Sequence, residues 1–403
     1  MGIEVVVDGL TKSFGSHVVW SDVSLTLPAG EVSVMLGPSG TGKTVFLKAL
    51  VGLVRPDRGR VVVDGIDTVS CSERQLYQAR KLFGVMFQDG ALFGSLNLFD
   101  NVAFPLREHT RLTEAEIRRV VLAKMDMVGL AGDGGKFPGE ISGGMRKRAG
   151  LARALVLDPQ IILCDEPDSG LDPVRTAYLS QLLIDLNAEI DATILIVTHD
   201  IQIARTVPDN IGMLFRGHLV MFGPREVLLT SDNPVITQFV NGRRIGPIGM
   251  SEEKDDATLA AEQLDQAANG GGIGVVQQPA LEPQLVPSPG RPERQAVQRR
   301  TSRVLSMLHT LPESAQHAIG ATIPVGIAGQ EAGRPAQRGA GQEPATSPWP
   351  QPASGTETGP QPGETGPEPG EPGGPREPGS TEPESSEHEG RSWPSWLPGG
   401  GRK

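Results

Sequence analysis

A glycine-rich segment near the amino terminus has the residue types and the spacing of a phosphate-binding loop. Residues 37–44 read GPSGTGKT and fit the pattern G-x-x-x-x-G-K-[ST] at every position. Glycines let backbone N–H groups approach phosphate oxygens, Lys43 can reach the β and γ phosphates, and the Thr44 hydroxyl can ligate Mg²⁺. A glycine-rich turn with an accidental lysine is disfavoured, because an apolar run precedes the segment and a helical pattern follows it. The residues predicted to bind ATP here are Gly37, Pro38, Ser39, Gly40, Thr41, Gly42, Lys43 and Thr44.

Two adjacent acids follow a second apolar run. Residues 161–165 read IILCD, and Glu166 comes next. We expect Asp165 to hold Mg²⁺, directly or through a water, and Glu166 to polarise the water that attacks the γ phosphate. Such a pair is often only a solvated turn, but the phosphate-binding pattern upstream favours the catalytic interpretation.

Three further motifs are weak when taken alone. Gln88 follows the apolar run VMF, residues 141–146 read ISGGMR, and His199 follows the run TILIVT. A lone glutamine is usually on the surface, SGG is usually a loop, and a histidine at a strand end is usually structural. However, a serine and two glycines that open a helix present free N–H groups at its positive end, which favours an anion.

The segments that carry these motifs alternate between strand and helix patterns. Residues 32–36, 161–165 and 193–197 are short apolar runs, and 176–187 has a helical pattern. This alternation predicts an α/β domain built on a mainly parallel sheet. Residues 112–130 begin with a cap at Thr113, a glutamate three positions later and apolar spacing of helical period, so we expect an inserted helical subdomain over about 89–160.

Composition divides the chain of 403 residues into a body and a tail. Of the 34 prolines, 22 follow residue 250, where apolar side chains are too sparse for burial to offset the entropy of ordering. We predict a folded domain over 1–245, a flexible linker over 246–298, short amphipathic helices over 299–322 and a disordered Pro/Gly/Glu-rich tail over 323–403.

Charge and cysteine content exclude several classes of protein. The formal net charge of −11 divides into −3 for the body and −8 for the tail, which gives no electrostatic reason to bind nucleic acid. Cys71 and Cys164 are too few for a disulfide framework and have no partner at metal-ligand spacing. No run of about 18 apolar residues occurs, so we expect no direct membrane span, and any work on a membrane must go through a partner.

The order of the motifs resembles that of ABC-type ATPases over residues 1 to about 240. The resemblance implies an ABC-type P-loop ATPase core with an antiparallel β part beside the mainly parallel sheet. By it, Gln88 is the Q-loop residue that contacts nucleotide and Mg²⁺, Asp172 belongs to the D-loop, and His199 is the switch histidine. Phe14 would stack on adenine, although the residues alone favour a core position in the first strand pair.

The same resemblance assigns the signature motif. Ser142, Gly143, Gly144 and Met145 match it, with Met145 in place of the usual glutamine and Ile141 in place of leucine. The N–H donors are unaffected by these changes. In this family two copies form a head-to-tail dimer in which the signature of each covers the ATP on the other. The implied sites are catalytic Lys43, Glu166 and His199, and Mg²⁺ ligands Thr44, Gln88 and Asp165.

A closer resemblance concerns three long segments. ISGGMRKRAGLARAL, DGALFGSLNLFDNVAFPLREH and DEPDSGLDPVRTAYLSQL are similar to the ATPases of Mla and Mce lipid-transport systems, particularly the actinobacterial Mkl or MceG type. This resemblance implies ATP hydrolysis coupled to lipid or sterol import through a YrbE-type integral-membrane permease. It also implies a peripheral place on the cytoplasmic face of the plasma membrane.

An ABC ATPase that acts on nucleic acid or ribosomes is the main alternative. Translation-factor types carry two cassettes, whereas this chain has one phosphate loop. Chromosome types need hundreds of coiled-coil residues between loop and signature, but Lys43 and Ser142 are only 99 positions apart. DNA-repair types insert zinc sites that two cysteines cannot build. A non-enzymatic regulator is disfavoured because Lys43, Asp165, Glu166 and His199 are all present.

Two segments carry more apolar residues than their surroundings. Residues 89–104 follow Gln88 and either receive the permease or pack the helical subdomain. Residues 302–321 have a helical pattern up to Pro312, where a second short helix can start. This second segment is either a transient helix in a linker or one that folds on a partner ATPase subunit or permease. The apolar residues of the first segment are Ala91, Leu92, Phe93, Leu96, Leu98 and Phe99.

Overall fold

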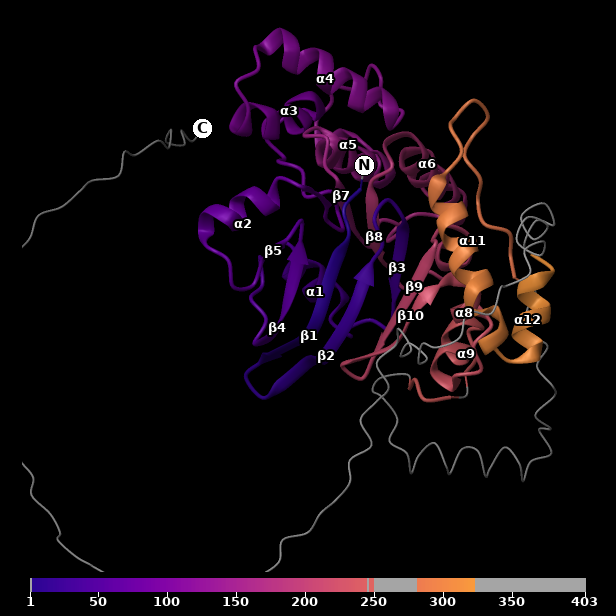
Figure 1. Ribbon diagram of the computed structural model, residues 1–403. Helices are drawn as coiled ribbons and strands as arrows, with labels where there is room; N and C mark the ends of the chain where they lie inside the picture. The colour runs from indigo at the N-terminus through magenta and orange to yellow at the C-terminus, as the bar shows by residue number, and fades with distance from the viewer. Residues whose placement is uncertain (1, 245, 250–280, 323–403) are drawn as a thin grey trace, which may run out of the picture. The chain divides into compact units, whose positions relative to one another are not determined.

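The computed structural model describes residues 2–244, 246–249 and 281–322 (Figure 1). A six-stranded core sheet has the order β10-β9-β3-β8-β7-β6, and every neighbouring pair is parallel except β10 with β9. Its strands are β3 (Val32–Leu36), β6 (Phe83–Met86), β7 (Ile161–Asp165), β8 (Thr193–Val197), β9 (Asn210–Phe215) and β10 (His218–Pro224).

A smaller antiparallel sheet has the order β2-β1-β4-β5. Its strands are β1 (Val5–Phe14), β2 (His17–Leu27), β4 (Arg58–Val63) and β5 (Ile66–Asp67). The predicted combination of a mainly parallel sheet with an antiparallel β part is therefore confirmed.

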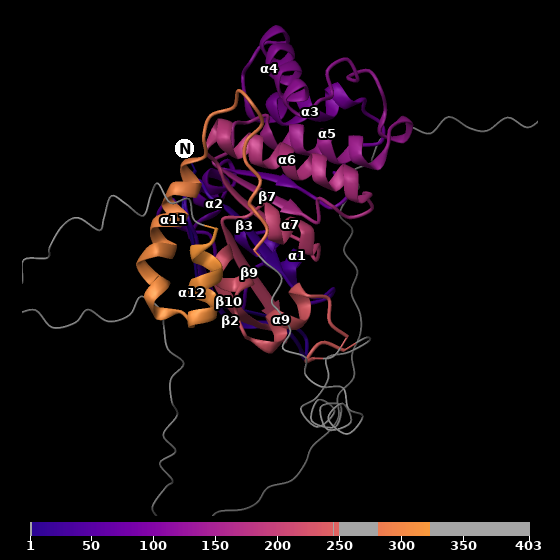
Figure 2. The same cartoon turned by 90° about the vertical axis from the view of Figure 1, so that its right-hand side faces the viewer.

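Helices connect and cover these sheets (Figures 1 and 2). In the body they are α1 (Lys43–Leu50), α2 (Glu73–Arg80), α3 (Leu98–His109), α4 (Glu114–Met127), η1 (Pro138–Glu140), α5 (Gly143–Leu155), α6 (Pro173–Ile190), α7 (Ile201–Thr206), α8 (Arg225–Leu229) and α9 (Pro234–Val240). Farther along the chain are α11 (Gln295–Met307), η2 (Leu308–Thr310) and α12 (Glu313–Gly320).

The core sheet is buried on both faces, which explains why its strands read as continuous apolar runs. In β7, Ile162 and Cys164 pack in one cluster with side chains of α3, α4, α5 and α6. Ile161 and Leu163 point the other way and pack with β1, β2 and α1. The strand ends that carry the candidate site are therefore held between two apolar layers.

The helical subdomain consists of α3, α4 and α5, which contact one another and lie together in Figures 1 and 2. The predicted cap of α4 is confirmed: the Thr113 N–H donates to Glu116 Oε2 at 2.7 Å, and the Glu116 N–H donates to Thr113 Oγ1 at 3.4 Å. This reciprocal pair satisfies N–H groups that the first turn of a helix leaves free.

Within the described ranges, none of the helices combines the length and the apolar character needed to cross a lipid bilayer.

Residues 281–322 are here called the C-terminal segment. Their contacts with the body begin before residue 299, where the predicted linker was expected to end and the helices to start. The Leu285 N–H donates to the Thr206 carbonyl at 2.8 Å, the Ser288 N–H donates to Asp185 Oδ1 at 2.7 Å, and α11 begins at Gln295. The linker prediction rested on sparse apolar residues, whereas these contacts are polar. Residues 250–280 of the predicted linker and the predicted tail, 323–403, lie outside the described residues.

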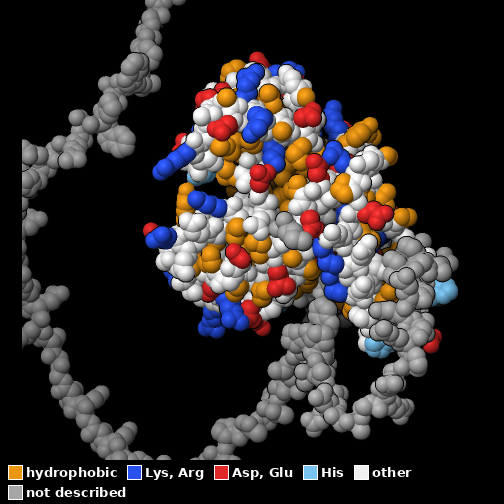
Figure 3. Space-filling view, turned by 45° about the horizontal axis from the view of Figure 1, so that its top comes forward, with side chains coloured by type: hydrophobic (Ala, Val, Ile, Leu, Met, Phe, Trp, Pro, Cys, Tyr) orange, Lys and Arg blue, Asp and Glu red, His pale blue; other side chains and the backbone are white. Residues whose placement is uncertain are grey.

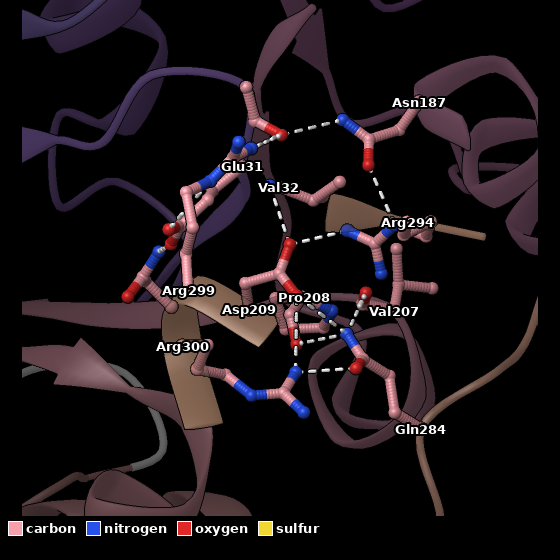
Figure 4. Close-up of polar contacts among 12 residues, drawn as sticks. Glu31, Val32, Asn187, Val207, Pro208, Asp209, Gln284, Arg294, Arg299 and Arg300 are labelled. Atoms are coloured by element: carbon pink, nitrogen blue, oxygen red, sulfur yellow. Dashed lines mark hydrogen bonds and ion pairs between the residues drawn. The ribbon is translucent and has the colours of Figure 1, made fainter. Parts of the chain in front are cut away.

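Arginines fasten the C-terminal segment to two fully buried carboxylates of the body (Figure 4). Arg294 and Arg300 pair with Asp209, and Arg303 pairs with Glu31. Asp209 Oδ2 also accepts the Val32 N–H at 2.9 Å, at the start of β3. Burial alone would raise the pKa of Asp209, but Arg294 and Arg300 hold it below its ordinary value.

Candidate nucleotide-binding site

The phosphate-binding loop lies at the carboxyl end of β3, the strand that pairs with β8 on one side and with β9 on the other. Gly42 caps the start of α1 with φ +82°, and a Cβ on it would lie 2.3 Å from Val19 Cγ1. Only glycine fits such a left-handed, closely approached position. The amino end of α1 therefore follows directly on the loop, as an anion site requires.

Lys43 lies under this loop rather than in solvent. Its Nζ donates to the carbonyls of Gly37 and Pro38, both at 2.8 Å. Burial lowers the pKa of the ammonium, and the nearby carboxylates of Glu166 and Asp165 act in the opposite direction. The only lysine of the motif is thus held at the loop, next to the two predicted acids.

Two predicted Mg²⁺ ligands meet beside the loop. The Thr44 hydroxyl donates to Asp165 Oδ1 at 2.9 Å, so two hard oxygen donors converge at one point. Mg²⁺ is usually bound by one or two such protein oxygens together with phosphate oxygens and waters. Burial raises the pKa of Asp165, a cost to its charged form that a bound cation would offset. These residues fit the metal.

Glu166 lies between Gln88 and His199, the predicted Q-loop residue and switch histidine. Gln88 Nε2 donates to Glu166 Oε2 at 3.1 Å, and His199 Nδ1 lies 3.5 Å from Glu166 Oε1. The backbone of Glu166 has φ +45°, a left-handed conformation that is unfavourable for a residue with a side chain. The structure therefore brings together three residues that are 33 to 111 positions apart in the chain.

Phe14 lies at the end of β1 and is not a core residue. Its side chain is 54% exposed, and Lys12 Nζ lies 5.0 Å from the centre of its ring. An exposed aromatic face is available for stacking on a base. The adenine role stays a prediction, but the alternative of a core position does not hold.

The signature residues open a helix, as the sequence predicts. Ser142 caps α5, its Oγ accepting the Met145 N–H at 3.3 Å, and Gly143 and Gly144 form the first turn. Asp172 caps α6 in the same way, accepting the Arg175 N–H at 3.0 Å.

The predicted site residues form two separate groups. Among residues 2–244, no hydrogen bond or ion pair links 142–145 or Asp172 to the phosphate loop. The loop group follows the carboxyl ends of β3, β6, β7 and β8, and the signature group lies at the amino ends of α5 and α6.

Two buried polar residues near Glu166 were missed by the sequence reasoning. Lys147, in the second turn of α5, donates to the Glu166 carbonyl at 3.1 Å. Asp168 accepts the Thr198 hydroxyl at 2.7 Å, next to His199 in the chain. The available signal was a cation five positions after Ser142 and a third acid after Glu166, but both types are common on surfaces.

Comparisons with known proteins agree with this geometry. Residues 20–169 match the family model described as ABC transporter. Over 321 residues the chain is 70% identical to the "Probable ribonucleotide transport ATP-binding protein mkl" of Mycobacterium tuberculosis, a match covering 79% of this chain and 89% of that one. Over 244 residues it is 40% identical to the "Intermembrane phospholipid transport system ATP-binding protein MlaF" of Haemophilus influenzae, covering 60% and 92%.

Two solved structures of ABC-type proteins are also similar to this chain. A dimeric ATP-binding cassette in a post-hydrolysis state, bound to ADP and Pi, is 32% identical with a TM-score of 0.51, covering 55% of this chain and 98% of that one. A component of an ABC transporter complex from Clostridium perfringens is 27% identical with a TM-score of 0.53, covering 59% and 94%.

Proposed function

The chain belongs to the ABC transporter family as an ATP-hydrolysing, ATP-binding subunit, and from this premise we propose that it powers the import of lipids or sterols through a YrbE-type permease. The observation that carries the ATP-driven part of the proposal is the convergence of Gln88 and His199 on Glu166, beside Lys43 and the Thr44–Asp165 pair. This arrangement provides for phosphate binding, metal binding and water activation in one place.

The residues divide the work of hydrolysis. The loop N–H groups and Lys43 bind the β and γ phosphates, and Phe14 stacks on the adenine. Thr44 and Asp165 hold Mg²⁺, with Gln88 as a further ligand. When bound, the metal neutralises charge on the phosphate oxygens. The Glu166 carboxylate takes a proton from the attacking water. Gln88 and His199 orient the two oxygens of this carboxylate.

A second copy of the chain supplies the remaining contacts. The amino ends of α5 and α6 carry Ser142, Gly143, Gly144, Met145 and Asp172, and the Gly143 and Gly144 N–H groups at the positive end of α5 suit an anion. In a head-to-tail dimer these residues cover the ATP held by the loop of the other copy. ATP then joins the two subunits, and its hydrolysis by Glu166 releases them.

The cargo is inferred from sequence resemblance and not from the nucleotide site. One set of relatives is named for ribonucleotide transport and another for phospholipid transport. We favour lipid or sterol because the segments around the signature and the acids resemble lipid-transport ATPases. The cargo itself contacts the permease, and the ATPase is held by that permease at the cytoplasmic face of the plasma membrane.

The test is a purification from membranes followed by a transport assay. We expect a YrbE-type permease to co-purify with the full chain, and labelled lipid or sterol uptake to depend on ATP hydrolysis. Uptake of ribonucleotide in place of lipid would overturn the cargo assignment alone. Recovery of nucleic acid or ribosomes without a permease would favour the non-transport alternative.

On the face shown in Figure 3, Lys and Arg are interspersed with Asp and Glu, which does not favour a nucleic-acid partner.

A further inference from the structure

Lys147 is a buried cation to which the mechanism above gives no part. It lies in the second turn of α5 with only 3% of the residue exposed. Its Nζ donates to the carbonyl of Glu166 at 3.1 Å, to Ser169 Oγ at 3.1 Å and also to the Ser169 carbonyl. All three acceptors belong to the turn that follows β7, so one side chain fastens α5 to the turn that carries the predicted base.

The backbone of that turn needs such a contact. Glu166 adopts the left-handed conformation at φ +45°, which persists in a residue with a side chain only when its surroundings enforce it. Its N–H donates to the Val197 carbonyl at 2.8 Å, which ties it to β8. Its carbonyl accepts from Lys147. Together the two bonds fix the peptide groups on both sides of the Glu166 Cα, and so the direction in which its carboxylate leaves the backbone.

The charges around Lys147 favour its ammonium in this place. Burial lowers its pKa, while Asp168, Asp89 and Glu166 act in the opposite direction. A neutral aliphatic residue would remove the charged donor from the Glu166 and Ser169 carbonyls, and Glu166 would keep only the Ser169 N–H, at 3.2 Å. A buried acceptor that loses a charged donor is strongly unfavourable, so the turn would rearrange.

We propose that Lys147 is a positioning residue for ATP hydrolysis, which holds the Glu166 turn so that the carboxylate stays between Gln88 and His199. The proposal rests on the assignment of Glu166 as the base. Lys147 also connects the loop group and the signature group of predicted site residues within one subunit. Ser142, which caps α5, and Lys147, which holds the Glu166 turn, lie on the same short helix. A shift of the signature end of α5 therefore moves the donor that orients the base.

The experiment compares three variants of the full chain. Lys147→Met removes the charge and the donor but keeps an unbranched apolar side chain one atom shorter, and Lys147→Arg keeps a cation. Lys124→Met is the matched control, because Lys124 lies on α4 of the same subdomain and pairs at 2.6 Å with the exposed Asp158. Steady-state hydrolysis of MgATP gives kcat and KM for each variant, and thermal unfolding reports the fold.

We expect Lys147→Met to lower kcat roughly 10- to 100-fold, the effect of one lost charged hydrogen bond, while the KM for ATP stays within about threefold. Lys147→Arg recovers most of kcat, and Lys124→Met matches the wild type. If the role of Lys147 were purely structural, Lys147→Met would instead lower the unfolding temperature, and kcat would not fall selectively while KM stayed constant. Wild-type kcat in Lys147→Met would overturn the proposal.

A second measurement separates this proposal from the proposed function. Amide hydrogen exchange over residues 165–172 needs no turnover, and we expect it to be faster in Lys147→Met than in the wild type or in Lys124→Met. Equal exchange in all three would overturn the positioning role even if the wild type proved inactive. An inactive wild type with faster exchange in Lys147→Met would contradict the proposed function alone. If Lys147→Met does not fold, Lys147→Gln serves in both measurements.

Discussion

Glu166 is held at both its backbone and its side chain by residues from different parts of the chain. Val197 and Lys147 bind its backbone, and Gln88 and His199 approach its carboxylate. A base that is oriented before the substrate arrives loses little freedom at the moment of reaction. The predictions at the scale of the residue therefore concern this carboxylate and the lysine of the phosphate loop.

The first prediction concerns Glu166→Gln. The amide keeps the shape of the side chain but cannot accept the proton, so we expect turnover to fall roughly 100- to 10,000-fold while ATP still binds. A dimer should accumulate with ATP, measured by size-exclusion chromatography. Glu114→Gln is the control, because Glu114 is exposed and pairs with Arg107 on the helical subdomain. Wild-type turnover in Glu166→Gln would show that another group is the base.

The second prediction concerns Lys43→Ala. The change removes the cation that faces the β and γ phosphates, and we expect transport and hydrolysis to fall at least roughly 100-fold. The body should stay folded, because among residues 2–244 the Lys43 side chain bonds to the carbonyls of its own loop. Circular dichroism checks the fold, and labelled lipid uptake checks transport. Normal uptake with this variant would contradict the ATP-driven role.

At this scale the sequence was informative where a motif is contiguous. Residues 37–44 and the pair at 165 and 166 follow apolar strands, so their positions could be predicted from local patterns. Lys147 could not, because its acceptors lie 19 and 22 positions away and meet it only through the packing of α5 against β6 and β7. A helix pattern shows which face is apolar but not which buried cation finds a carbonyl.

At the scale of the element, the segment after Gln88 divides into core and surface. Leu98 is fully buried, and Leu92 and Phe99 pack against the core. Phe93 instead is 44% exposed and lies 4.9 Å from the exposed ring of Phe104, measured between ring centres. The core alternative therefore holds for Leu92, Leu98 and Phe99, whereas docking at the exposed Phe93 stays a prediction. The sequence shows the apolar character of the segment but not which side chains face the core.

The third prediction uses this exposed aromatic pair. Two adjacent exposed rings are suited to an apolar helix of a permease. Phe93→Asp should lower the amount of co-purified permease roughly tenfold or more, because a charge replaces a central aromatic contact. The segment is expected to stay in place in the variant, because the Phe93 N–H donates to Asn101 Oδ1 at 2.7 Å and the Phe93 carbonyl accepts from Asn101 Nδ2 at 3.1 Å, whatever the side chain.

The control for this prediction is Leu122→Asp. Leu122 lies on α4 of the same subdomain and is 43% exposed, almost the same as Phe93. We expect unchanged recovery of the permease with this variant and unchanged unfolding temperature with both. Equal loss from the two variants would indicate a general effect of surface charge rather than a docking site.

At the scale of the whole molecule, the C-terminal segment is joined to the ATPase body through charge. The arginines of this segment face Asp209 and Glu31, at the ends of β9 and β3 opposite to the nucleotide loop. The match with the mycobacterial relatives spans 321 residues and so extends beyond the body, whereas the MlaF match spans 244. The helical pattern was recognised only from residue 302, whereas α11 begins at Gln295. Its partners could not be predicted, because Arg294, Arg300 and Arg303 find buried carboxylates that lie far away in the sequence.

The fourth prediction tests this contact with Arg294→Met. Arg294 and Asp209 are both completely buried, and Arg294 Nε also donates to Asn187 Oδ1 of α6 at 2.6 Å. Removing one partner leaves a buried carboxylate with less compensation, so we expect the free energy of unfolding to fall by about 3–5 kcal/mol. Urea unfolding of the full chain measures the change, and hydrogen exchange should quicken over 281–307.

Arg291→Met is the matched control for this prediction, because it lies in the same segment and pairs with Glu189 where both side chains are about 40% exposed. An exposed pair contributes about 0–1 kcal/mol, so this variant should unfold close to the wild type. If Arg294→Met is no less stable than Arg291→Met, the segment does not depend on the buried carboxylates. If stability falls but exchange over 281–307 stays slow, Arg294 acts on the body by itself, through Asn187 and Asp209, and the segment is held by its other contacts.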